Sequence, residues 1–370
     1  MSDNGKKIIA LPIVDYTTIR QRPQQLLSRF AKHGYTVLHV SPHVASRNLS
    51  VETTEDEGVS RVVLSHSPYQ SFLHSKDSSM KIEVIAFEIE KIAYPHSPVL
   101  WINSPYWFEV AARLKEKMDV VVVYDVLDNF IHFEDLRPHV EKLTVWHKSL
   151  VEISDHVFYT ASYFSEVMPE IFNRPVTYLP NACEPEVWES NVLEKPTEVI
   201  VGYFGCIASW FDVDLVNRIA AESSFFVDVL GPKSSKDEFA VLDNLRVHPK
   251  QVEHKVLAES ASRWRCGIIP FLKIPLTDCT DPVKLYEYMA AGLPVVATEL
   301  EELKLLSASM PKHIRPSLIP FGYPEYFKGA ILKEIATDDE HKRKDRKKWA
   351  SEHTWDIRAA TALEVLGGLR

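Results

Sequence analysis

The sequence predicts an α/β protein with two Rossmann-like domains, in each of which helices cover a parallel sheet. Short β-branched runs alternate with longer amphipathic segments along the whole chain, which is the pattern of repeated β–α–β units. A chain of 370 residues is too long for one ordinary core, and its 45% hydrophobic content allows two. A proline-bearing stretch at residues 184–197 separates the two series of units and indicates an interdomain linker.

The first domain, expected over residues 1–183, opens with a strand at residues 8–14. A helix follows at residues 23–33 and ends at Gly34. The acidic stretch at residues 52–57 is interpreted as a solvated loop. Further strands are expected at residues 36–40, 98–102, 120–124, 155–160 and 176–179, and further helices at residues 82–93 and 138–154.

The second domain, expected over residues 198–350, repeats the pattern. Its first strand, at residues 199–204, leads through Gly205 into a helix at residues 212–222. A last helix is expected within residues 351–370, over residues 355–366. Other strands of this domain are expected at residues 225–230, 245–248, 266–270 and 293–297, with helices at residues 252–263 and from residue 281.

The composition excludes several classes of protein. A formal charge of −9 leaves no basic excess to replace the counterions of a nucleic acid, so no nucleic-acid partner is expected. The four cysteines are scattered without a C-x-x-C pair, which indicates reduced thiols and argues against a disulfide framework or a zinc site. The first strand is too short for a signal-peptide core, and no apolar run has the length of a membrane span. We therefore expect a cytoplasmic protein.

The stretch from Asp281 to Thr298, DPVKLYEYMAAGLPVVAT, concentrates the features of a ligand site. Asp281 is an N-cap residue type, and Gly292 fits the left-handed position that ends a helix. Between them, Lys284 and Glu287 stand three residues apart on one helix face. A carboxylate and an ammonium near a helix start favour a polar, anionic ligand, although an ordinary surface ion pair has the same pattern.

The string P-x-K-x-Y-E-Y-x-A-A-G-x-P-V-V in this stretch resembles the donor-binding signature of GT-B glycosyltransferases, in particular the bacterial family 4 type of cell-surface polysaccharide synthesis. The resemblance implies two Rossmann-like domains facing a central cleft, with the C-terminal helix crossing back to the first domain. It also implies that Glu287 binds the ribose hydroxyls of a nucleotide-sugar and that Lys284 lies near the diphosphate. A carboxylate suits a vicinal diol because a charged acceptor forms stronger hydrogen bonds.

Other parts of the second domain extend the resemblance. Gly205 stands where the family has a Y-x-G turn that brings main-chain amides close to the donor diphosphate, and the start of the next helix favours anions. The Arg and Lys that usually follow are missing, so Lys284, Lys273 or an arginine of the first domain is expected to neutralise the phosphates. The first acid of the family's Glu-x7-Glu pattern is replaced by Cys279. The residues expected to contact the donor hexose are Asp278, Cys279 and Thr280.

Polar side chains follow the expected central strand of the first domain, in the string YDVLDNF. Asp125 and Asp128 stand at the carboxyl end of a parallel strand, where they can orient sugar hydroxyls or assist proton transfer. The D-x-x-D spacing also allows a divalent metal, and Asp128 can instead cap a helix. The family resembled often has Y-D-x-x-D-x-F here, which favours contact with a sugar acceptor. Asp125 and Asp128 are therefore the candidate catalytic residues, and Asn103 and Asn129 are candidate acceptor or cleft contacts.

The loop after the first strand carries the string IRQRPQQ. The family resembled often has an R-P pair followed by an amide or a histidine in this loop. Arg22 and Gln24 are therefore candidate ligand contacts. The alternative is an arginine at a helix start that contacts only solvent.

The resemblance implies transfer of a hexosyl group from a nucleotide-sugar, with UDP-sugars favoured, to a glycan or lipid-linked acceptor. It implies retention of configuration and no metal or other cofactor. A GT-B epimerase and a non-catalytic protein of the same fold remain alternatives. A dinucleotide oxidoreductase is not favoured because neither first-strand loop carries G-x-G-x-x-G. The basic run HKRKDRKK, from His341 to Lys348, is either a solvated helix face or a peripheral contact with an anionic membrane surface.

Overall fold

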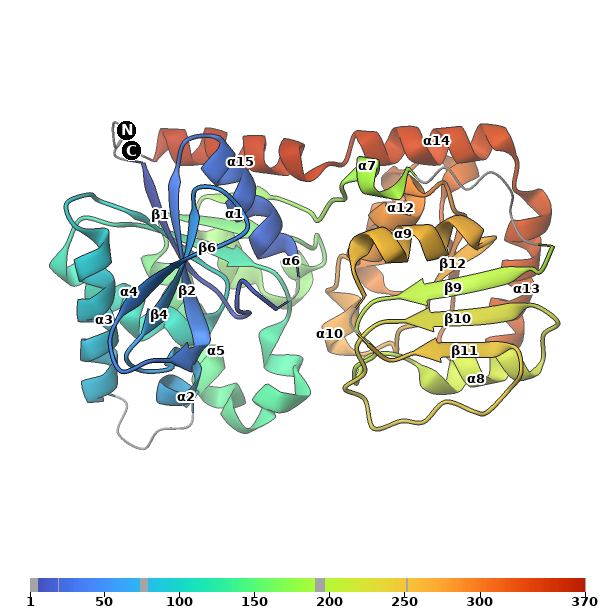
Figure 1. Cartoon of the computed structure of the whole chain (residues 1–370), viewed down its shortest axis with the longest axis horizontal. Coiled ribbons are helices and arrows are strands. Elements are labelled where there is room, and N and C mark those ends of the chain that lie inside the picture. Colours follow the sequence, from blue (N-terminus) through green and yellow to red (C-terminus); the bar gives the residue numbers. More distant parts are fainter. Residues whose placement is uncertain (1–5, 19, 74–78, 190–196, 251, 370) are drawn as a thin grey trace. The chain divides into compact units, whose positions relative to one another are not determined.

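The computed structural model describes residues 6–18, 20–73, 79–189, 197–250 and 252–369 (Figure 1). The chain divides into two compact units. Unit 1 is formed by the chain up to Pro180 together with the segment from Trp355 onward, and unit 2 by Asn181–Thr354. The division lies close to the expected boundaries at residues 183 and 350. The expected linker falls inside unit 2, and its residues 190–196 lie outside the described ones.

Unit 1 is built on an eight-stranded sheet with the order β3-β4-β2-β1-β5-β6-β7-β8. The pair β3 and β4 is antiparallel, and the other neighbours are parallel. The order reverses between β1 and β5, because the chain first adds strands on one side of β1 and then on the other. The strands are β1 (Lys7–Leu11), β2 (Thr36–Ala45), β3 (Ser50–Thr53), β4 (Val59–Leu64), β5 (Val99–Ile102), β6 (Val121–Val126), β7 (His156–Tyr159) and β8 (Val176–Tyr178).

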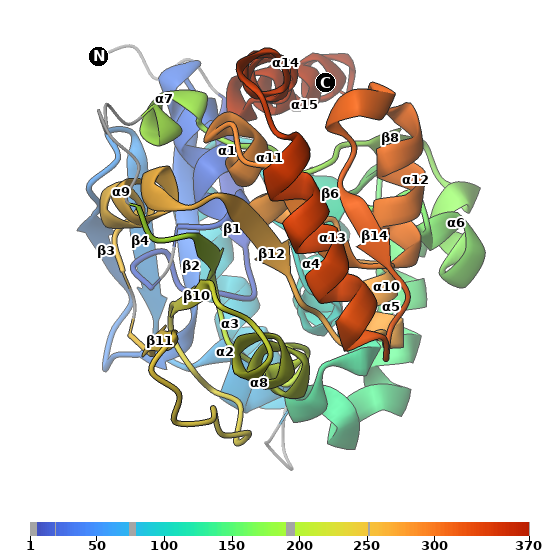
Figure 2. The same cartoon turned by 90° about the vertical axis from the view of Figure 1, so that its right-hand side faces the viewer.

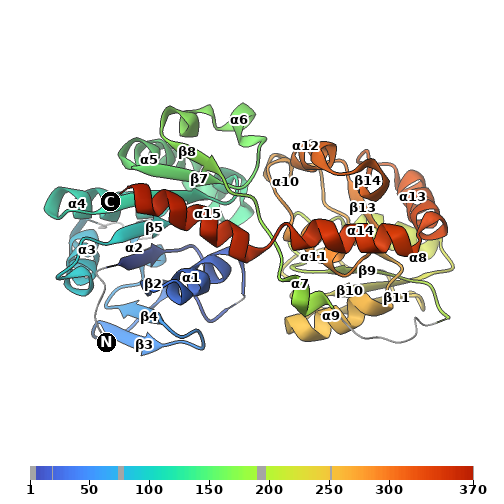
Figure 3. The same ribbon diagram turned by 90° about the horizontal axis from the view of Figure 1, so that it is seen from above.

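Helices cover both faces of this sheet. The C-terminal helix α15 (Trp355–Gly368) lies beside α1 (Arg22–Lys32) in unit 1, as Figure 3 shows. An ion pair between Arg29 Nε and Asp356 Oδ1 at 3.1 Å joins the two helices. The expectation that the last helix returns to the first domain is thus confirmed. The other helices are α2 (Pro68–Leu73), α3 (Ser79–Ala93), α4 (Phe108–Lys117), α5 (Val140–Ile153) and α6 (Phe164–Val167).

Unit 2 is built on a parallel six-stranded sheet with the order β11-β10-β9-β12-β13-β14. Helices α8 and α13 pack together on one face, as Figure 2 shows, while α9, α11 and α14 belong to the other. The strands are β9 (Ile200–Phe204), β10 (Phe226–Leu230), β11 (Leu245–His248), β12 (Cys266–Ile269), β13 (Val295–Thr298) and β14 (Ser317–Ile319). The helices are α7 (Pro185–Trp188), α8 (Val213–Ala221), α9 (His254–Arg263), α10 (Pro275–Asp278), α11 (Val283–Ala290), α12 (Glu301–Ser309), α13 (Pro324–Thr337) and α14 (Glu340–Ser351).

The core of unit 2 explains two glycines in its central strands. Gly202 of β9 and Gly267 of β12 are paired across the sheet. A Cβ at Gly202 would lie 2.0 Å from the Trp264 ring, and one at Gly267 would lie 2.6 Å from the Tyr288 ring. Both positions therefore exclude side chains because large aromatic rings occupy that space.

The expected α/β class with two parallel sheets is confirmed, but some elements differ. The acidic stretch at residues 52–57 is not only a loop, since its first residues belong to the edge strand β3. Helices α4, α12 and α13 and strand β14 were not expected from the sequence. In the described part of the chain, no helix combines the length and apolar character needed to cross a membrane.

Candidate active site

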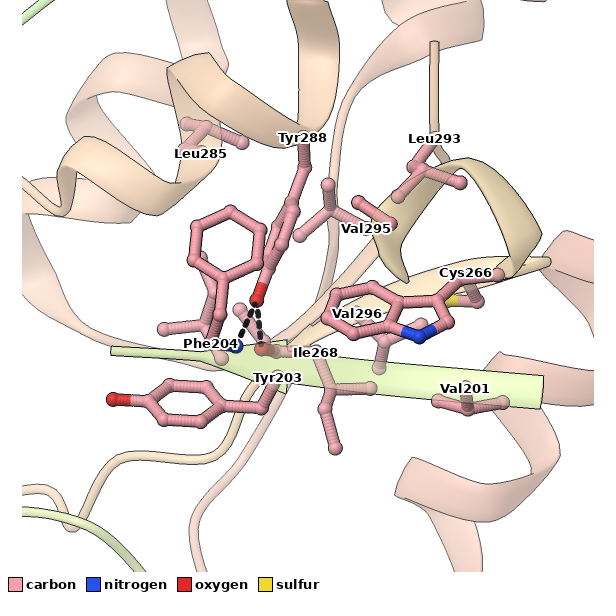
Figure 4. Close-up of a cluster of buried hydrophobic side chains, with 14 of the residues drawn as sticks. Val201, Tyr203, Phe204, Cys266, Ile268, Leu285, Tyr288, Leu293, Val295 and Val296 are labelled. Atoms are coloured by element: carbon pink, nitrogen blue, oxygen red, sulfur yellow. Dashed lines mark hydrogen bonds between the residues drawn. The ribbon is translucent and has the colours of Figure 1, made fainter. Parts of the chain in front are cut away.

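The sheet of unit 2 reverses its strand order between β9 and β12, and β9 is followed directly by Gly205. In parallel α/β sheets, ligands bind beyond the carboxyl ends of the strands at such a reversal. Past the pair Gly202 and Gly267, Tyr288 joins the two strands: its hydroxyl accepts from the amide of Phe204 and donates to the carbonyl of Ile268, both at 3.3 Å (Figure 4). The helix that carries Tyr288, α11, is thereby fixed at the reversal.

Lys284, in the first turn of α11, reaches back to this point. A Cβ placed on Gly205 would lie 2.2 Å from its Cε and 2.5 Å from its Nζ, so the lysine stem lies against the bare face of the glycine. Gly205 has a φ of +134°, which also disfavours a side chain there. The ammonium lies 5.5 Å from the centre of the Tyr203 ring and 5.7 Å from that of Phe271. Close packing against Gly205 therefore holds the ammonium beside the end of β9.

The Lys284 ammonium has no hydrogen bond or ion pair with any described residue. Burial lowers its pKa, while the charge of Glu287 acts in the opposite direction. A half-buried cation without a protein counter-ion is costly unless a ligand supplies the negative charge. This end of β9 is therefore suited to bind an anion.

Glu287 lies one turn further along α11, with a side chain that is 12% exposed. Burial raises the pKa of its carboxyl to about 7; the charge of Lys284 lowers it and that of Glu184 raises it further. Its Oε1 lies 4.0 Å from Nε2 of His254, the first residue of α9. The predicted pair of Lys284 and Glu287 is thus placed in one region, but not as the surface ion pair that the sequence also allowed.

Two expected sources of phosphate binding are already occupied. The start of α8 is capped by Asp212, whose carboxylate accepts from the amide of Leu215 at 2.8 Å, so a negative group already satisfies that helix end. Lys273 donates to Asp278 Oδ1 and Glu301 Oε1, both at 2.8 Å. Of the two lysines expected near the phosphates, only Lys284 has no carboxylate partner among the residues that the structure describes.

The loop expected to bind the hexose is largely engaged within the protein. Asp278 also accepts from the amide of Glu301 at 3.2 Å, and thereby caps α12. Its own amide and that of Thr280 donate within the turn of α10, at 3.0 Å each. The Thr280 hydroxyl donates to the carbonyl of Leu276, and Cys279 is buried. These contacts give Asp278, Cys279 and Thr280 a structural role and argue against their predicted role in ligand binding.

Asp281 is not the N-cap that the sequence suggested, because Pro282 occupies that position of α11. Its Oδ2 instead accepts from the amide of Asn181 at 2.6 Å and from the hydroxyl of Tyr286 at 3.1 Å. Asn181 returns a hydrogen bond from its side chain to the Asp281 carbonyl at 2.7 Å. Asp281 therefore ties the loop before α11 to the chain segment that enters unit 2. Gly292, with a φ of +74°, does end the helix as expected.

In unit 1, Arg22 and Asp125 form a buried ion pair. Arg22 donates from Nη2 to Oδ1 at 2.8 Å and from Nε to Oδ2 at 3.2 Å, and Asn103 donates to the same Oδ2 at 3.0 Å. Asp125 is fully buried, and Arg22 also donates to the carbonyl of Leu179 at 2.8 Å. With both oxygens occupied, Asp125 links β6 to α1 and β5. These contacts with Arg22 and Asn103 give Asp125 a structural role, and its predicted catalytic role stays a prediction.

Gln24 is also a structural residue. It is buried in the first turn of α1, where its Oε1 accepts from the amide of Gln21 at 3.1 Å and its amide donates to the carbonyl of Asp15 at 3.3 Å. Asn129 is buried as well, and its carbonyl accepts from the amide of His132 at 3.0 Å. The Gln24 side chain thus shapes the loop before α1. The contact of Asn129 is made by its backbone, so the predicted ligand contact of its side chain stays a prediction.

Asp128 differs from Asp125 although only two residues separate them. Its carboxylate is half-buried and has no hydrogen-bond or ion-pair partner among the residues that the structure describes. Burial raises its pKa to about 6, and the charge of Arg22 opposes that rise. A carboxylate with a pKa near 6 is ionised at neutral pH and is a stronger base than an ordinary aspartate. Without a fixed partner, it is suited to accept a proton from a hydroxyl group. Asp128 is therefore the better candidate of the predicted pair.

The sequence analysis missed a second polar cluster in unit 1, at the end of β1. Asp15 accepts from Nε of Arg61 at 2.9 Å, from Nη2 at 2.9 Å and from the hydroxyl of Ser41. Burial opposes its ionisation, yet these donors hold the pKa of Asp15 below its usual range. The residues come from three segments without a common motif, so only the fold brings them together.

The basic run at residues 341–348 has two parts in the structure. Arg346 is buried, donates to the Gly292 carbonyl at 3.0 Å and pairs with Asp338, which also pairs with Arg343 at 2.8 Å. Arg346 thereby ties α14 to the end of α11, and both arginines pair with Asp338 at the end of α13. Three lysines of the run are exposed to solvent: Lys344, Lys347 and Lys348.

Comparison with solved structures identifies the architecture. Sucrose-phosphate synthase from Thermosynechococcus elongatus superimposes with a TM-score of 0.76 at 14% identity, over 98% of this chain and 99% of that one. An E. coli structure titled trehalose-6-phosphate bound with UDP-2-fluoro glucose gives 0.73 at 8% identity, over 98% of each chain. A glycosyltransferase from Rickettsia africae gives 0.72 at 10% identity, over 99% of each. The chain has the GT-B glycosyltransferase fold.

Sequence comparison adds a relative that matches part of the chain. A segment of 205 residues is 23% identical to a protein of Bacillus subtilis (strain 168) named as a teichuronic acid biosynthesis glycosyltransferase, TuaH. The match covers 50% of this chain and 49% of TuaH, so the matched segment spans about half the length of that relative. No family model matches the chain. In this GT-B fold, the sites described above lie at the carboxyl ends of the central strands of each unit.

Proposed function

We propose that the protein is a glycosyltransferase that transfers a hexosyl group from a nucleotide-sugar to a hydroxyl of a glycan or of a lipid-linked acceptor. The observation that carries this proposal is the position of Lys284. Its ammonium lies against Gly205 at the strand-order reversal of unit 2, with Glu287 one turn away and no counter-ion among the described residues. An anionic, hydroxyl-bearing ligand satisfies both groups at once.

The chemistry of a nucleotide-sugar fits these two residues. Lys284 supplies positive charge for the diphosphate, which gains negative charge as the bond to the sugar breaks, so the cation stabilises the leaving group. Glu287 in its ionised form accepts hydrogen bonds from the two ribose hydroxyls. Since its pKa is about 7, the ionised form dominates only in neutral or alkaline solution until a donor ligand stabilises it. The nucleotide is then held at its diphosphate by Lys284 and at its ribose by Glu287.

We assign the acceptor hydroxyl to unit 1, with Asp128 as the group that orients it or accepts its proton. Its lack of a protein partner and its raised pKa support this role. Asp125 acts through Arg22 and Asn103, as a positioning residue for the loop that carries Asp128. No nucleophilic side chain is needed if the configuration is retained as in family 4, which is part of the same proposal.

The named relatives support the choice of substrates. Trehalose-phosphate synthases from Burkholderia species are titled UDP-forming, and the E. coli structure holds a UDP-sugar derivative, so UDP-sugars are the first donors to test. TuaH is named for teichuronic acid biosynthesis, which favours a glycan or lipid-linked acceptor. An acceptor on the cytoplasmic face of a membrane would place the exposed Lys344, Lys347 and Lys348 near anionic lipid.

The experiment is a thermal-shift panel of UDP-, GDP-, ADP- and dTDP-sugars, because a ligand that binds the native state raises the melting temperature. One nucleotide-sugar is expected to raise it, and Lys284→Ala is expected to abolish most of that shift. Lys236→Ala is the matched control, since Lys236 is an exposed lysine of unit 2. A panel without any shift, or an unchanged shift in Lys284→Ala, would refute the proposed donor site.

The reaction itself is tested with the donor that the panel selects. Transfer requires an acceptor, so incubation of the protein with donor alone is expected to give only slow hydrolysis. Formation of an isomeric nucleotide-sugar in that incubation would instead indicate an epimerase. Binding without either product in the presence of glycan and lipid-linked acceptors would indicate a protein that has lost catalysis.

A further inference from the structure

Two histidines and one carboxylate that the proposed donor site does not use meet on unit 2. His341 and Asp345 stand four residues apart on α14, so they share one helix face. His313 comes from the short 3-10 turn Lys312–Ile314 that packs against α14. Asp345 Oδ2 lies 2.6 Å from His313 Nε2 and 3.2 Å from His341 Nδ1. One ligand atom from each of the three residues lies within 4.8 Å of the others.

We propose that His313, His341 and Asp345 bind a divalent transition-metal ion of the Zn²⁺ type. Two imidazole nitrogens and one carboxylate oxygen are a ligand set that zinc accepts, with water completing a tetrahedron. Ligand atoms of such a tetrahedron, bound at about 2.0–2.1 Å, are separated by roughly 3.3 Å. The 3.2 Å separation between Asp345 and His341 lies close to that value. The 2.6 Å separation between Asp345 and His313 is a hydrogen-bond distance, so the exposed His313 ring must move outward by side-chain rotation to admit the ion.

The same three groups are held as hydrogen-bonded pairs when no metal is bound. His313 holds the pKa of Asp345 below its usual value, and the charges of His341 and Lys348 act in the same direction. A bound divalent ion takes over the stabilisation of the ionised Asp345, because it carries two positive charges. The positive charge of Lys348 repels a cation at this position. The affinity for a metal ion must therefore come from the two imidazole ligands together with the carboxylate. Mg²⁺, which prefers oxygen ligands in an octahedral arrangement, is not expected to bind here.

The metal would join two elements that are separate in the sequence. It would fix the turn at residues 312–314 to α14, the helix whose end precedes the return of the chain to unit 1. Because the ligands belong to the folded state, binding stabilises unit 2. Binding uses the lone pairs of both imidazoles, so the two histidines are ligands only in their neutral form. The inference is independent of the proposed glycosyltransferase activity.

The test is isothermal titration of the full-length, tag-free, EDTA-dialysed protein with ZnCl₂ at pH 7.5, repeated with MgCl₂. One Zn²⁺ per chain is expected, with no heat from Mg²⁺. His341→Ala, His313→Ala and Asp345→Asn are each expected to weaken binding at least tenfold. The control is His33→Ala, which removes an exposed histidine of unit 1. Thermal melts without metal show whether each variant is folded.

The outcomes separate the proposal from binding elsewhere. The proposal is supported by a single site that all three cluster variants weaken and that His33→Ala leaves unchanged. Absence of Zn²⁺ binding to the folded protein would overturn it. Binding that the cluster variants do not weaken would also overturn it, since the ion would then be held by other groups, such as the four free cysteines.

Discussion

Asp125 and Asp128 show how far the surroundings of a residue decide its role. Asp125 forms an ion pair with the buried Arg22, whereas Asp128 has no partner among the described residues and has a pKa of about 6. We predict that Asp128→Asn lowers the transfer rate by roughly 10²–10⁴-fold, the usual contribution of a general base, without lowering the melting temperature. The rate of the wild-type protein is expected to fall as the pH drops through about 6, because the carboxylate becomes protonated.

The matched variant is Asp125→Asn. It leaves Arg22 buried without its counter-ion, so we expect a loss of about 3–5 kcal/mol in unfolding free energy. Chemical denaturation measures this loss, and a rate assay of each variant completes the comparison. If Asp128→Asn retained the wild-type rate while only stability changed, Asp128 would be a structural residue like its neighbour.

We predict that the ionised Glu287 carboxylate lowers the stability of the free protein and contributes to nucleotide-sugar binding. Its folded-state pKa of about 7 lies above the value of about 4.3 in an unfolded chain. Stability from this group is therefore fully present below pH ~4 and is lost as the pH rises through about 7. Glu287→Gln is expected to stabilise the protein at pH 8 by on the order of 1–3 kcal/mol and to have no such effect at pH 4.

The same substitution is expected to weaken nucleotide-sugar binding by roughly 2 kcal/mol, about 30-fold, because a neutral amide is a poorer acceptor for the ribose hydroxyls. Denaturation curves at the two pH values and a binding titration at pH 8 test the two effects separately. Unchanged affinity in Glu287→Gln would remove this residue from the donor site, whatever happens to stability.

The sequence predicted the placement of residues well where they lie in one contiguous motif. Lys284 and Glu287 lie in one string on one helix, so their placement followed from helical spacing. It failed where the partner of a residue is distant in the chain. Asp125 is separated by 103 positions from Arg22, and nothing in the string YDVLDNF shows that an arginine will occupy both its oxygens. The cap formed by Asp212 was visible in the sequence, since an aspartate at a helix start is a common N-cap.

At the scale of elements, helix α11 depends on Tyr288 for its attachment to β9 and β12. Its hydroxyl is bonded to the Phe204 amide and the Ile268 carbonyl beyond the last pair of the two strands. We predict that Tyr288→Phe costs about 1–3 kcal/mol of stability, because two buried backbone groups lose a partner while the ring packing stays the same. Tyr326→Phe is the control, since that ring is 66% exposed. Equal melting temperatures for both variants would contradict this role.

Element prediction depended on periodicity. The central strands were recognised because they are buried on both faces and read as continuous β-branched runs, such as VVVY in β6. The edge strand β3 was not, since it is mostly exposed and the acidic pattern around it is typical of a loop. Helices α12 and α13 were missed because no motif drew attention to the chain between residue 298 and the basic run. The edge strands β8 and β11 were nevertheless expected, at residues 176–179 and 245–248.

At the scale of the whole molecule, each unit has its own sheet and core, and the chain passes between the units twice. Both passages leave unit 2 at one point, where the Cys183 amide donates to the His353 carbonyl at 3.2 Å and Cys183 forms a parallel bridge with Thr354. A domain with its own core can unfold by itself. A change that destabilises one unit is therefore expected to leave the unfolding of the other unit unaltered.

Removal of residues 355–370 tests this independence. The segment contributes α15 to unit 1, where Trp355 and Leu366 are buried, Asp356 pairs with Arg29, and Arg358 donates to the Pro180 carbonyl at 3.0 Å. We predict that the truncated protein loses at least about 3 kcal/mol of stability in unit 1, since loss of a single buried Trp side chain already costs that much. Unit 2 keeps all its elements, so its melting transition and its nucleotide-sugar affinity are expected to stay unchanged. Calorimetry that resolves the two transitions, with a chain lacking only Arg370 as control, measures the difference. A single transition shifted as a whole, together with lost donor binding, would show that the two units unfold as one.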